Sequence, residues 1–265
     1  MRLLVSLLLF PLTAYHSPLT AIQIQDNSFL IEEAYNQEAG VVQHINSFAR
    51  ASGGDWDYTF TQEWPLGGIR HQISYSVPVQ HADGSGTGLG DIALNYRYQL
   101  LGNPQASTLA APRVSLILPT GNDQLERGSG AVGVQVNLPL TQVVNSQLVT
   151  HWNAGTTLTP SAHDPLGQEA TTSDFNLGAS VVWLVRPSIN LLLEALWLSE
   201  ESVVGNGQTV RSDAGLVNPG IRLAFNLPGD LQIVPGVAYT IGLGSEANDD
   251  SLFLYLSFEH PFKRQ

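Results

Sequence analysis

The sequence predicts an all-β protein: a closed antiparallel transmembrane β-barrel of about twelve strands, preceded by a short helix. Three observations lead to this prediction. Apolar and polar residues alternate with a period of two from about residue 44 onward. Charged residues make up only 13% of the chain, against about 25% in a typical soluble domain. After the N-terminus no apolar run is long enough for a membrane helix, and a barrel is the membrane fold in which the two residue types alternate.

The first 21 residues, MRLLVSLLLFPLTAYHSPLTA, have the pattern of a secretory signal peptide. Arg2 supplies the positive charge, an apolar run of about ten residues follows, and Ala14 and Ala21 are small residues near its end. The apolar run is too short for a membrane anchor, and Pro11 interrupts it. We therefore expect residues 1–21 to direct export and to be cleaved.

Residues 22–43 are acidic and have a helical rather than a strand-like rhythm. Their carboxylates are Asp26, Glu32, Glu33 and Glu38. Asn27 or Ser28 is placed to cap a short helix and Gly40 to end it. Two locations stay open for this segment. It either leads into the first strand from the periplasm, or it enters the barrel as a plug whose Glu32 and Glu33 meet arginines of the lumen.

Residues 44–265 are the predicted barrel. In AVGVQVNLPL, residues 131–140, every second residue from Val132 to Leu140 is apolar. Segments of this kind have the length that a tilted membrane strand needs. Twelve are predicted, near residues 44–50, 55–64, 69–79, 89–100, 109–118, 130–140, 146–157, 174–185, 188–199, 213–226, 230–241 and 251–262.

The connections between these segments mostly alternate between short and long. The short ones are PLGG, LLGNPQ, TQVVN, RP and NLPGD, and the long ones are HADGSGTG, TGNDQLERGSG, TPSAHDPLGQEATTS, EESVVGNGQTV and GLGSEANDD. Outer-membrane barrels have short periplasmic turns and longer external loops, whereas a soluble β-sandwich would not need this asymmetry. We therefore predict the outer membrane of a Gram-negative bacterium, with both termini in the periplasm because the strand count is even.

The last segment, SLFLYLSFEHPF, resembles the C-terminal signal by which the barrel-assembly machinery recognises outer-membrane proteins. The expected partners are this machinery, outer-membrane lipids, lipopolysaccharide and a small-molecule solute, and the barrel is expected to be a monomer. A formal charge of −12 argues against nucleic acid, whose phosphates need basic patches. No motif predicts a metal site or a cofactor.

If the apolar phase of each strand faces lipid, the opposite phase lines the interior. The candidate pore-lining residues on that phase are Asp57, Glu63, Arg70, Asp91, Arg97, Arg113, Glu194, Arg222 and Glu259. Isolated buried charges are costly, so we expect these groups to pair. Two interpretations remain open: a structural set of salt bridges that packs a narrow lumen, or a charged constriction that selects what passes.

We do not expect an enzyme. A lipid-hydrolysing barrel needs a nucleophilic serine beside a histidine at its outer rim. No serine lies in a G-x-S-x-G context, and His151 is on the inward phase. The predicted function is a channel for passive uptake of small molecules. The alternatives are a closed barrel with a structural or surface-interaction role and, more remotely, an outer-membrane lipid hydrolase.

Three stretches carry a resemblance to a known family: IQDNSFLIEEAYNQEAGVVQHI (24–45), DIALNYRYQLL (91–101) and RVSLILPTG (113–121). The sequence resembles the family labelled "putative meta-pathway of phenol degradation". The resemblance covers most of the mature chain, and the N-terminal stretch is its most specific part. It implies an outer-membrane barrel that admits small molecules, among them aromatic or other hydrophobic compounds. It implies no catalytic residue and no cofactor.

Overall fold

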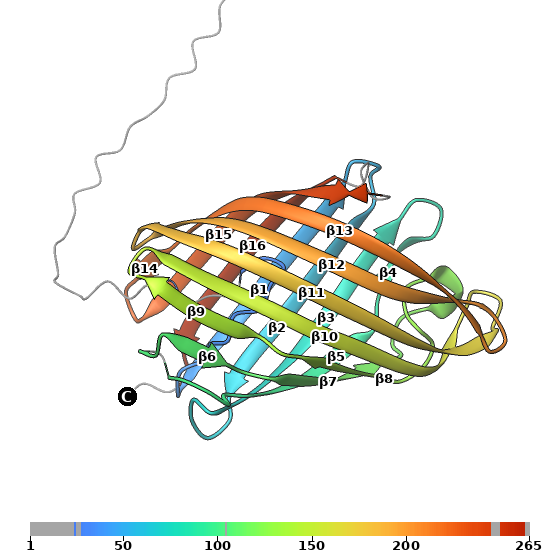
Figure 1. Cartoon of the computed structure of the whole chain (residues 1–265), viewed down its shortest axis with the longest axis horizontal. Helices are drawn as coiled ribbons and strands as arrows, with labels where there is room; N and C mark the ends of the chain where they lie inside the picture. The colour runs from blue at the N-terminus through green and yellow to red at the C-terminus, as the bar shows by residue number, and fades with distance from the viewer. Residues whose placement is uncertain (1–23, 25–27, 104, 245–249, 263–265) are drawn as a thin grey trace, which may run out of the picture.

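The computed structural model describes Ile24 and residues 28–103, 105–244 and 250–262. The predicted signal peptide, residues 1–21, lies outside the described residues. Sixteen strands form a single sheet (Figure 1). Their bounds are β1 (Val41–Ala51), β2 (Trp56–Pro65), β3 (His71–Ala82), β4 (Gly86–Leu89), β5 (Ile92–Tyr98), β6 (Thr108–Ala110), β7 (Arg113–Leu118), β8 (Gly133–Asn137), β9 (Leu140–Asn145), β10 (Leu148–His163), β11 (Glu169–Arg186), β12 (Ile189–Gly205), β13 (Gln208–Leu223), β14 (Phe225–Leu227), β15 (Leu231–Leu243) and β16 (Ser251–Pro261).

The sheet closes into a twelve-position antiparallel barrel, as the sequence predicts. The ring runs β1–β2–β3–β5–β7–β8–β10–β11–β12–β13–β15–β16, and β16 pairs with β1 to close it. The short strands β4, β6, β9 and β14 continue the positions of β5, β7, β8 and β13, to which they are adjacent in sequence. Each predicted strand segment corresponds to one position of the ring, and β1 begins slightly before its predicted start at residue 44.

Prolines explain two of the breaks that divide a ring position into two strands. Pro112 separates β6 from β7, and Pro139 separates β8 from β9, because a proline has no N–H for the ladder. The wall stays hydrogen-bonded at both breaks. The Tyr98 amide donates to the Pro112 carbonyl at 3.0 Å, and the Ala111 amide donates to the Pro139 carbonyl at 3.1 Å.

The two ends of the barrel differ. We call the end where β1 begins and β16 ends the terminal mouth, and the opposite end the hairpin mouth. At the hairpin mouth, β10 to β13 form the long hairpins seen in Figure 1, with 16, 18, 17 and 16 residues. About 9 to 11 residues suffice for a strand to cross a membrane. The asymmetry that the sequence predicts is therefore present, but it lies mainly in strand length.

Four of the predicted connections are corrected by this finding. TPSAHDPLGQEATTS, EESVVGNGQTV and HADGSGTG were expected to be loops, but most of their residues lie in strands, and the turns shrink to residues 164–168, 206–207 and 83–85. TQVVN, expected to be a turn, lies in β9. Threonine and valine are common in these stretches, HADGSGTG apart, and fit a paired strand, which explains why the ladders continue. TGNDQLERGSG remains a loop and contains one turn of 3-10 helix, Asp123–Leu125.

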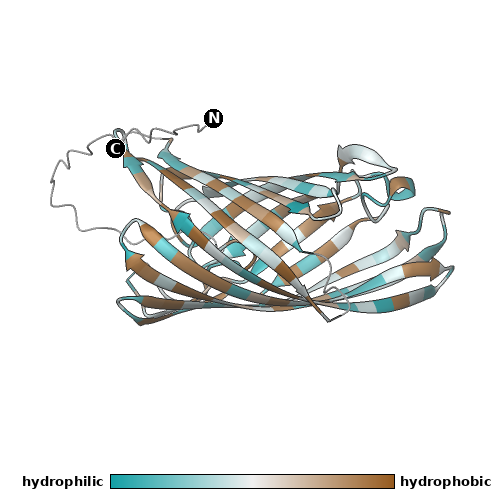
Figure 2. Ribbon diagram, turned by 90° about the horizontal axis from the view of Figure 1, so that it is seen from above, coloured by the Kyte–Doolittle hydropathy of each residue, from teal (hydrophilic) through white to brown (hydrophobic). Residues whose placement is uncertain are grey.

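Side chains alternate between the two faces of the wall with the predicted phase. In β12, Leu193 and Trp197 are 52% and 44% exposed on the outer face, whereas Asn190 and Glu194 are 1% and 0% exposed inside. Figure 2 shows this alternation as brown and paler bands along the strands. The outside of the barrel is thus apolar and its interior is polar, as expected for a barrel in lipid.

Among the described residues, no helix is both long enough and apolar enough to cross a membrane.

The N-terminal helix predicted before the first strand is not formed by residues 28–40, which have extended or bent backbone up to a turn at Ala39 and Gly40. Asp26 and the other positions between Gln25 and Asn27 lie outside the described residues. Gly40 has a φ of +85°, and the Val41 amide donates to the Glu38 carbonyl at 3.1 Å. This glycine therefore supports the turn into β1, a role for which its freedom at positive φ is needed, and it does not end a helix.

Candidate functional site

Residues 28–39, which we call the lumen segment, run through the interior of the barrel. Its contacts come from strands all around the ring, including β3, β5, β10 and β12, and Figure 1 shows its blue trace enclosed by the wall. Ile31, Glu33 and Ala34 are 1%, 2% and 0% exposed. The barrel wall therefore encloses the segment on all sides.

The backbone of the lumen segment is satisfied by side chains of the wall. The backbone amides and their acceptors are Leu30 and Ile31 to Glu194 (2.9 and 3.1 Å), Glu32 to Asn153 (2.8 Å), Ala34 to Thr141 (2.8 Å), Asn36 to Gln99 (3.3 Å) and Gln37 to Gln72 (2.7 Å). A buried amide needs a partner, and here the wall supplies it from several directions. This is the physical reason why an extended backbone replaces the predicted helix, whose amides would bond within the helix itself.

Arg97 of β5 donates hydrogen bonds to acceptor atoms of the lumen segment. Its guanidinium donates to the carbonyl of Glu33 at 3.3 Å, to the carbonyl of Tyr35 and to Oδ1 of Asn36 at 2.9 Å. It also lies 3.9 Å from the carboxylate of Glu63. The planar guanidinium has five N–H donors in a fixed arrangement, so one side chain can hold several acceptors of an irregular stretch of chain.

Both carboxylates that the sequence singles out in this segment contact arginines of the wall. Glu32 Oε1 lies 2.6 Å from Arg113 Nε, and Glu33 Oε1 lies 3.1 Å from Arg222 Nη2. Glu33 and Arg222 are almost fully buried, with side chains 2% and 1% exposed. Removing one partner of such a pair leaves an uncompensated buried charge, so the Glu33–Arg222 pair fixes the position of the segment.

The apolar side chains of the lumen segment fit into gaps left by glycines in the wall. The centroid of the Phe29 ring lies 5.5 Å from the ring centroid of Phe253 and 5.4 Å from that of Tyr255. A Cβ at Gly236 would overlap the Phe29 ring. Similarly, a Cβ at Gly178 would overlap the end of Ile31. These glycines sit within strands, where glycine is otherwise unfavourable, and close approach of another stretch of chain explains them.

Replacing Gly236 by alanine is therefore expected to displace Phe29 and to weaken docking of the lumen segment. Overpacking of this kind costs about 1–3 kcal/mol. We expect more frequent and larger open events in single-channel recordings of Gly236→Ala than of the unchanged protein. Gly215→Ala is the matched control, because a Cβ at Gly215 would meet Leu243 only at 3.4 Å, an ordinary contact. Equal recordings from both variants would contradict the role of the gap at Gly236.

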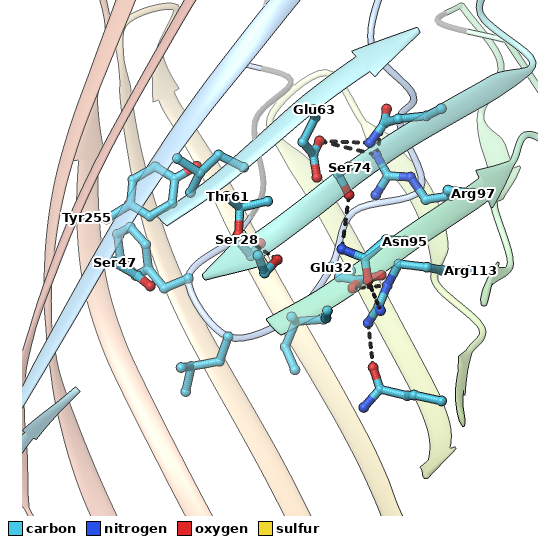
Figure 3. A pocket seen from close by; sticks show the side chains of 18 residues that line it. Ser28, Glu32, Ser47, Thr61, Glu63, Ser74, Asn95, Arg97, Arg113 and Tyr255 are labelled. Atoms are coloured by element: carbon cyan, nitrogen blue, oxygen red, sulfur yellow. Dashed lines mark hydrogen bonds and ion pairs between the residues drawn. The ribbon is translucent and has the colours of Figure 1, made fainter. Parts of the chain in front are cut away.

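Open space remains on the side of the lumen that faces β1 to β8. A cavity of about 290 Å³ lies between the lumen segment and this wall (Figure 3). Neutral polar side chains are numerous in its lining, among them Ser47, Thr61, Ser74, Ser76, Asn95 and Gln135. On the opposite side, apolar side chains of β10 to β16 pack with Phe29, and a second cavity of about 250 Å³ is lined by residues of the lumen segment and of β10, β11 and β12. The lumen segment is therefore flanked by open space on both sides.

Of the candidate pore-lining residues, five are turned into the interior and are mostly buried. They are Glu63, Arg97, Arg113, Glu194 and Arg222. All five lie within reach of the lumen segment or of a residue that binds it, and Arg97, Arg113 and Glu63 line the open cavity (Figure 3). The buried charges thus contact the segment or residues that bind it, and the two interpretations, a structural set of salt bridges and a charged constriction, both stay predictions.

The other four candidates lie elsewhere. Asp57 and Arg70 are exposed, and Glu259 is half-buried near the terminal mouth, where it pairs in register with Gln43. Asp91 accepts hydrogen bonds from the amides of Gly121 (2.9 Å) and Ser129 (2.8 Å). Asp91 thereby fastens the β7–β8 loop to the wall.

Sequence reasoning from charged residues missed the neutral side chains that bind the segment or, in the case of Asn218, bind Glu194, which holds it. These are Gln72, Gln99, Thr141, Asn153, Ser180 and Asn218. Nothing in the sequence signals this role, because the inward positions of any water-filled barrel are polar and only the structure shows that these amides and hydroxyls are buried. His151 belongs to the same group: its Nδ1 lies 2.8 Å from Thr141 Oγ1 and its Nε2 lies 3.5 Å from Glu33. This histidine is 1% exposed, away from the outer rim where lipid hydrolysis would require it.

Comparison with known proteins places the fold among bacterial outer-membrane barrels. An outer membrane channel from Pseudomonas putida F1 has a TM-score of 0.61 and 15% identity, with 86% of this chain and 98% of that chain covered. The NanC porin has a TM-score of 0.54 and 8% identity, over 84% and 100% of the two chains. The KdgM porin has a TM-score of 0.51 and 7% identity, over 83% and 99%. At these identities the likeness establishes the fold alone.

No curated protein sequence matched the chain. A family match, in contrast, extends over residues 23–249 and so includes both the lumen segment and most of the barrel. The match agrees with the resemblance carried by residues 24–45, 91–101 and 113–121. The chain belongs to the family described as "Putative MetA-pathway of phenol degradation".

Proposed function

We propose that the protein is a monomeric outer-membrane channel through which small organic molecules, among them aromatic or hydrophobic compounds, pass down their concentration gradient into the periplasm. Lipids and lipopolysaccharide surround the apolar outer face, both termini are periplasmic, and the barrel-assembly machinery inserts the chain. The observation that carries the proposal is the 290 Å³ cavity along the β1–β8 wall, beside a segment that occupies much of the remaining lumen. The solved barrels of the same fold are named porins and channels, which supports this proposal.

In this channel the lumen segment is a plug that limits the size of what passes, with Glu32 and Glu33 as its charged contacts. The pore-lining residues are the five inward charged residues, Glu63, Arg97, Arg113, Glu194 and Arg222, together with the neutral side chains of the cavity. A hydrophobic solute crosses next to the lumen segment, where Phe29, Leu30 and Ile31 face the cavity. A charged but locally paired interior suits such a solute, because little free charge has to be desolvated.

One observation favours the alternative of a closed structural barrel. The lumen segment and the apolar cluster around Phe29 fill the interior against β10 to β16, and a fully occluded barrel would have no transport function. A channel conducts ions across a bilayer, whereas a closed structural barrel does not.

The test is reconstitution of the purified, folded protein in a planar lipid bilayer. A steady, small single-channel conductance is expected, because the open path is narrow. Folding is checked independently by the shift in gel mobility between heated and unheated protein. Persistent electrical silence of protein that passes this check, together with no solute entry into liposomes, would exclude the channel and support the closed barrel.

A further inference from the structure

We propose that Arg113 is a binding site for the carboxylate of a small organic acid, and that Glu32 of the lumen segment occupies this site when the ligand is absent. The inference rests on the proposed channel function and names a substrate class for it: organic monocarboxylates with an apolar body. Four features of the described structure carry it.

The first feature is the set of groups around Arg113. Its Nη1 donates to Asn95 Oδ1 at 3.1 Å and to Ser115 Oγ, and its Nη2 donates to Gln135 Oε1 at 2.9 Å. All three acceptors are neutral. In the described part of the chain, Glu32 is the carboxylate that pairs with Arg113, at 2.6 Å from Nε. A guanidinium stays charged at all accessible pH values and matches the shape of a carboxylate, so loss of Glu32 leaves a cation that needs another anion.

The second feature is the difference between Glu32 and its neighbour. Glu33 is held by Arg222 at 3.1 Å and by the hydroxyl of Ser28 at 3.3 Å, and its side chain is 2% exposed. The Glu32 side chain is 26% exposed, and its Oε2 has no hydrogen-bond partner among the described residues. That oxygen is itself buried, so the docked Glu32 carboxylate leaves one oxygen unsatisfied, and such a group leaves its partner at lower cost than a fully bonded one. Glu33 is therefore the anchor and Glu32 the exchangeable group.

The third feature is the position of the Glu32–Arg113 pair between two cavities. The cavity of about 290 Å³ and a second cavity of about 250 Å³ share Leu30, Glu32, Arg113 and Gln135 in their linings. Figure 3 shows Glu32 and Arg113 turned toward one another at the edge of the first cavity. When a ligand replaces Glu32, the carboxylate of Glu32 moves away from Arg113, and the boundary between the two cavities opens while Glu33 keeps the segment in place.

The fourth feature is the chemistry of the two linings. The first cavity has Phe29, Ile31, Ile45 and Tyr255 as apolar surface in the same lining as Arg113. Its charged residues, Arg97, Arg113, Glu32 and Glu63, balance in formal charge, and withdrawal of Glu32 makes the lining positive. The second cavity contains Asp174 and Glu200, which repel an anion. An organic acid therefore reaches Arg113 from the first cavity, with its carboxylate toward the guanidinium and its apolar body along the lumen segment.

Benzoate is a suitable probe, with benzyl alcohol as the uncharged molecule of similar size and shape. Titration calorimetry on the folded, detergent-solubilised protein is expected to show weak benzoate binding to the unchanged chain. Glu32→Gln removes the internal competitor and is expected to tighten benzoate binding by about tenfold, the equivalent of one charge-assisted contact. Arg113→Gln is expected to abolish it. Benzyl alcohol should bind equally to all three proteins.

Arg211→Gln is the matched arginine control, because Arg211 pairs with Glu201 at 3.0 Å and lines neither cavity. The proposal is overturned if benzoate affinity is unchanged in both Glu32→Gln and Arg113→Gln. It is also overturned if benzoate affinity changes equally in Arg211→Gln. The opposite signs expected for Glu32→Gln and Arg113→Gln keep the test valid even when one variant is less stable.

Bilayer recordings separate this inference from the proposed channel function. If the protein conducts but benzoate changes neither current nor binding through Glu32 and Arg113, the carboxylate site is wrong and the channel stands. If all variants stay silent while benzoate binding still depends on the two residues, the channel is wrong and the binding site stands.

Discussion

Deletion of residues 28–39 is expected to raise the single-channel conductance several-fold. The lumen segment occupies the interior between the cavity along β1 to β8 and the opposite wall, and its removal replaces buried protein with water along the lumen. The wall itself is closed by the pairing of β16 with β1, so the barrel does not depend on the segment for its ladder. Conductance of the deletion variant and of the unchanged protein is compared in the same lipid and salt.

The deletion also exposes inner charges such as Glu194 and Arg222 to water, which lowers the cost of leaving them without the segment. Heat-dependent gel mobility shows whether the variant is folded. Gly215→Ala serves as a substitution that leaves the lumen unchanged. A folded deletion variant with unaltered conductance would show that residues 28–39 do not limit the pore.

The second large effect is expected from Arg222→Met. This change leaves the carboxylate of Glu33 buried without the guanidinium 3.1 Å away, and breaking a buried pair in this way costs about 3–5 kcal/mol. We expect the lumen segment to leave its docked position far more often. The chain contains no cysteine, so Ile31→Cys, at a position 1% exposed, provides a single thiol that reports this release. Its labelling rate should rise by about a hundredfold or more, the equivalent of that free energy.

The double change Glu33→Gln with Arg222→Met is the decisive control. It removes both charges, so no isolated ion remains, and the labelling rate of the thiol introduced by Ile31→Cys should rise much less than with Arg222→Met alone. Arg211→Met in the same reporter background should have no effect, because Arg211 pairs with Glu201 at 3.0 Å. Equal labelling in the single and double variants would show that the pair does not hold the segment.

Much of the barrel was predictable because lipid and lumen demand opposite side chains on alternate residues. In β12 the sequence INLLLEALWL places Leu193 and Trp197 in one phase and Asn190 and Glu194 in the other, and a wall that is apolar outside and carries polar groups inside accommodates all four. The short turns RP and PLGG were equally readable, because proline and glycine favour turns. The ends of the strands at the hairpin mouth were not predictable, since threonine-rich stretches suit both a loop and a paired strand.

The conformation of the lumen segment could not be predicted from its own residues. The acidic, helical rhythm of residues 28–40 and the position of Gly40 predict a helix, because local rules count only hydrogen bonds within the segment. The barrel offers competing partners from distant strands, such as Glu194 for the amides of Leu30 and Ile31 and Arg97 for the carbonyl of Glu33. Those partners lie more than sixty residues away along the chain, so no local pattern reveals them.

The class of fold, the number of ring positions, the inward phase and the acidic character of the segment before the first strand follow from the order of residues along the chain. These properties depend on residue periodicity and composition, which the chain carries locally. The extended conformation of the segment, the pairing of Glu33 with Arg222 and of Glu32 with Arg113, and the cavity against β1 to β8 arise in the folded barrel. The reason is closure: joining β16 to β1 brings side chains from all twelve positions around one interior, and the segment adopts the conformation that satisfies them.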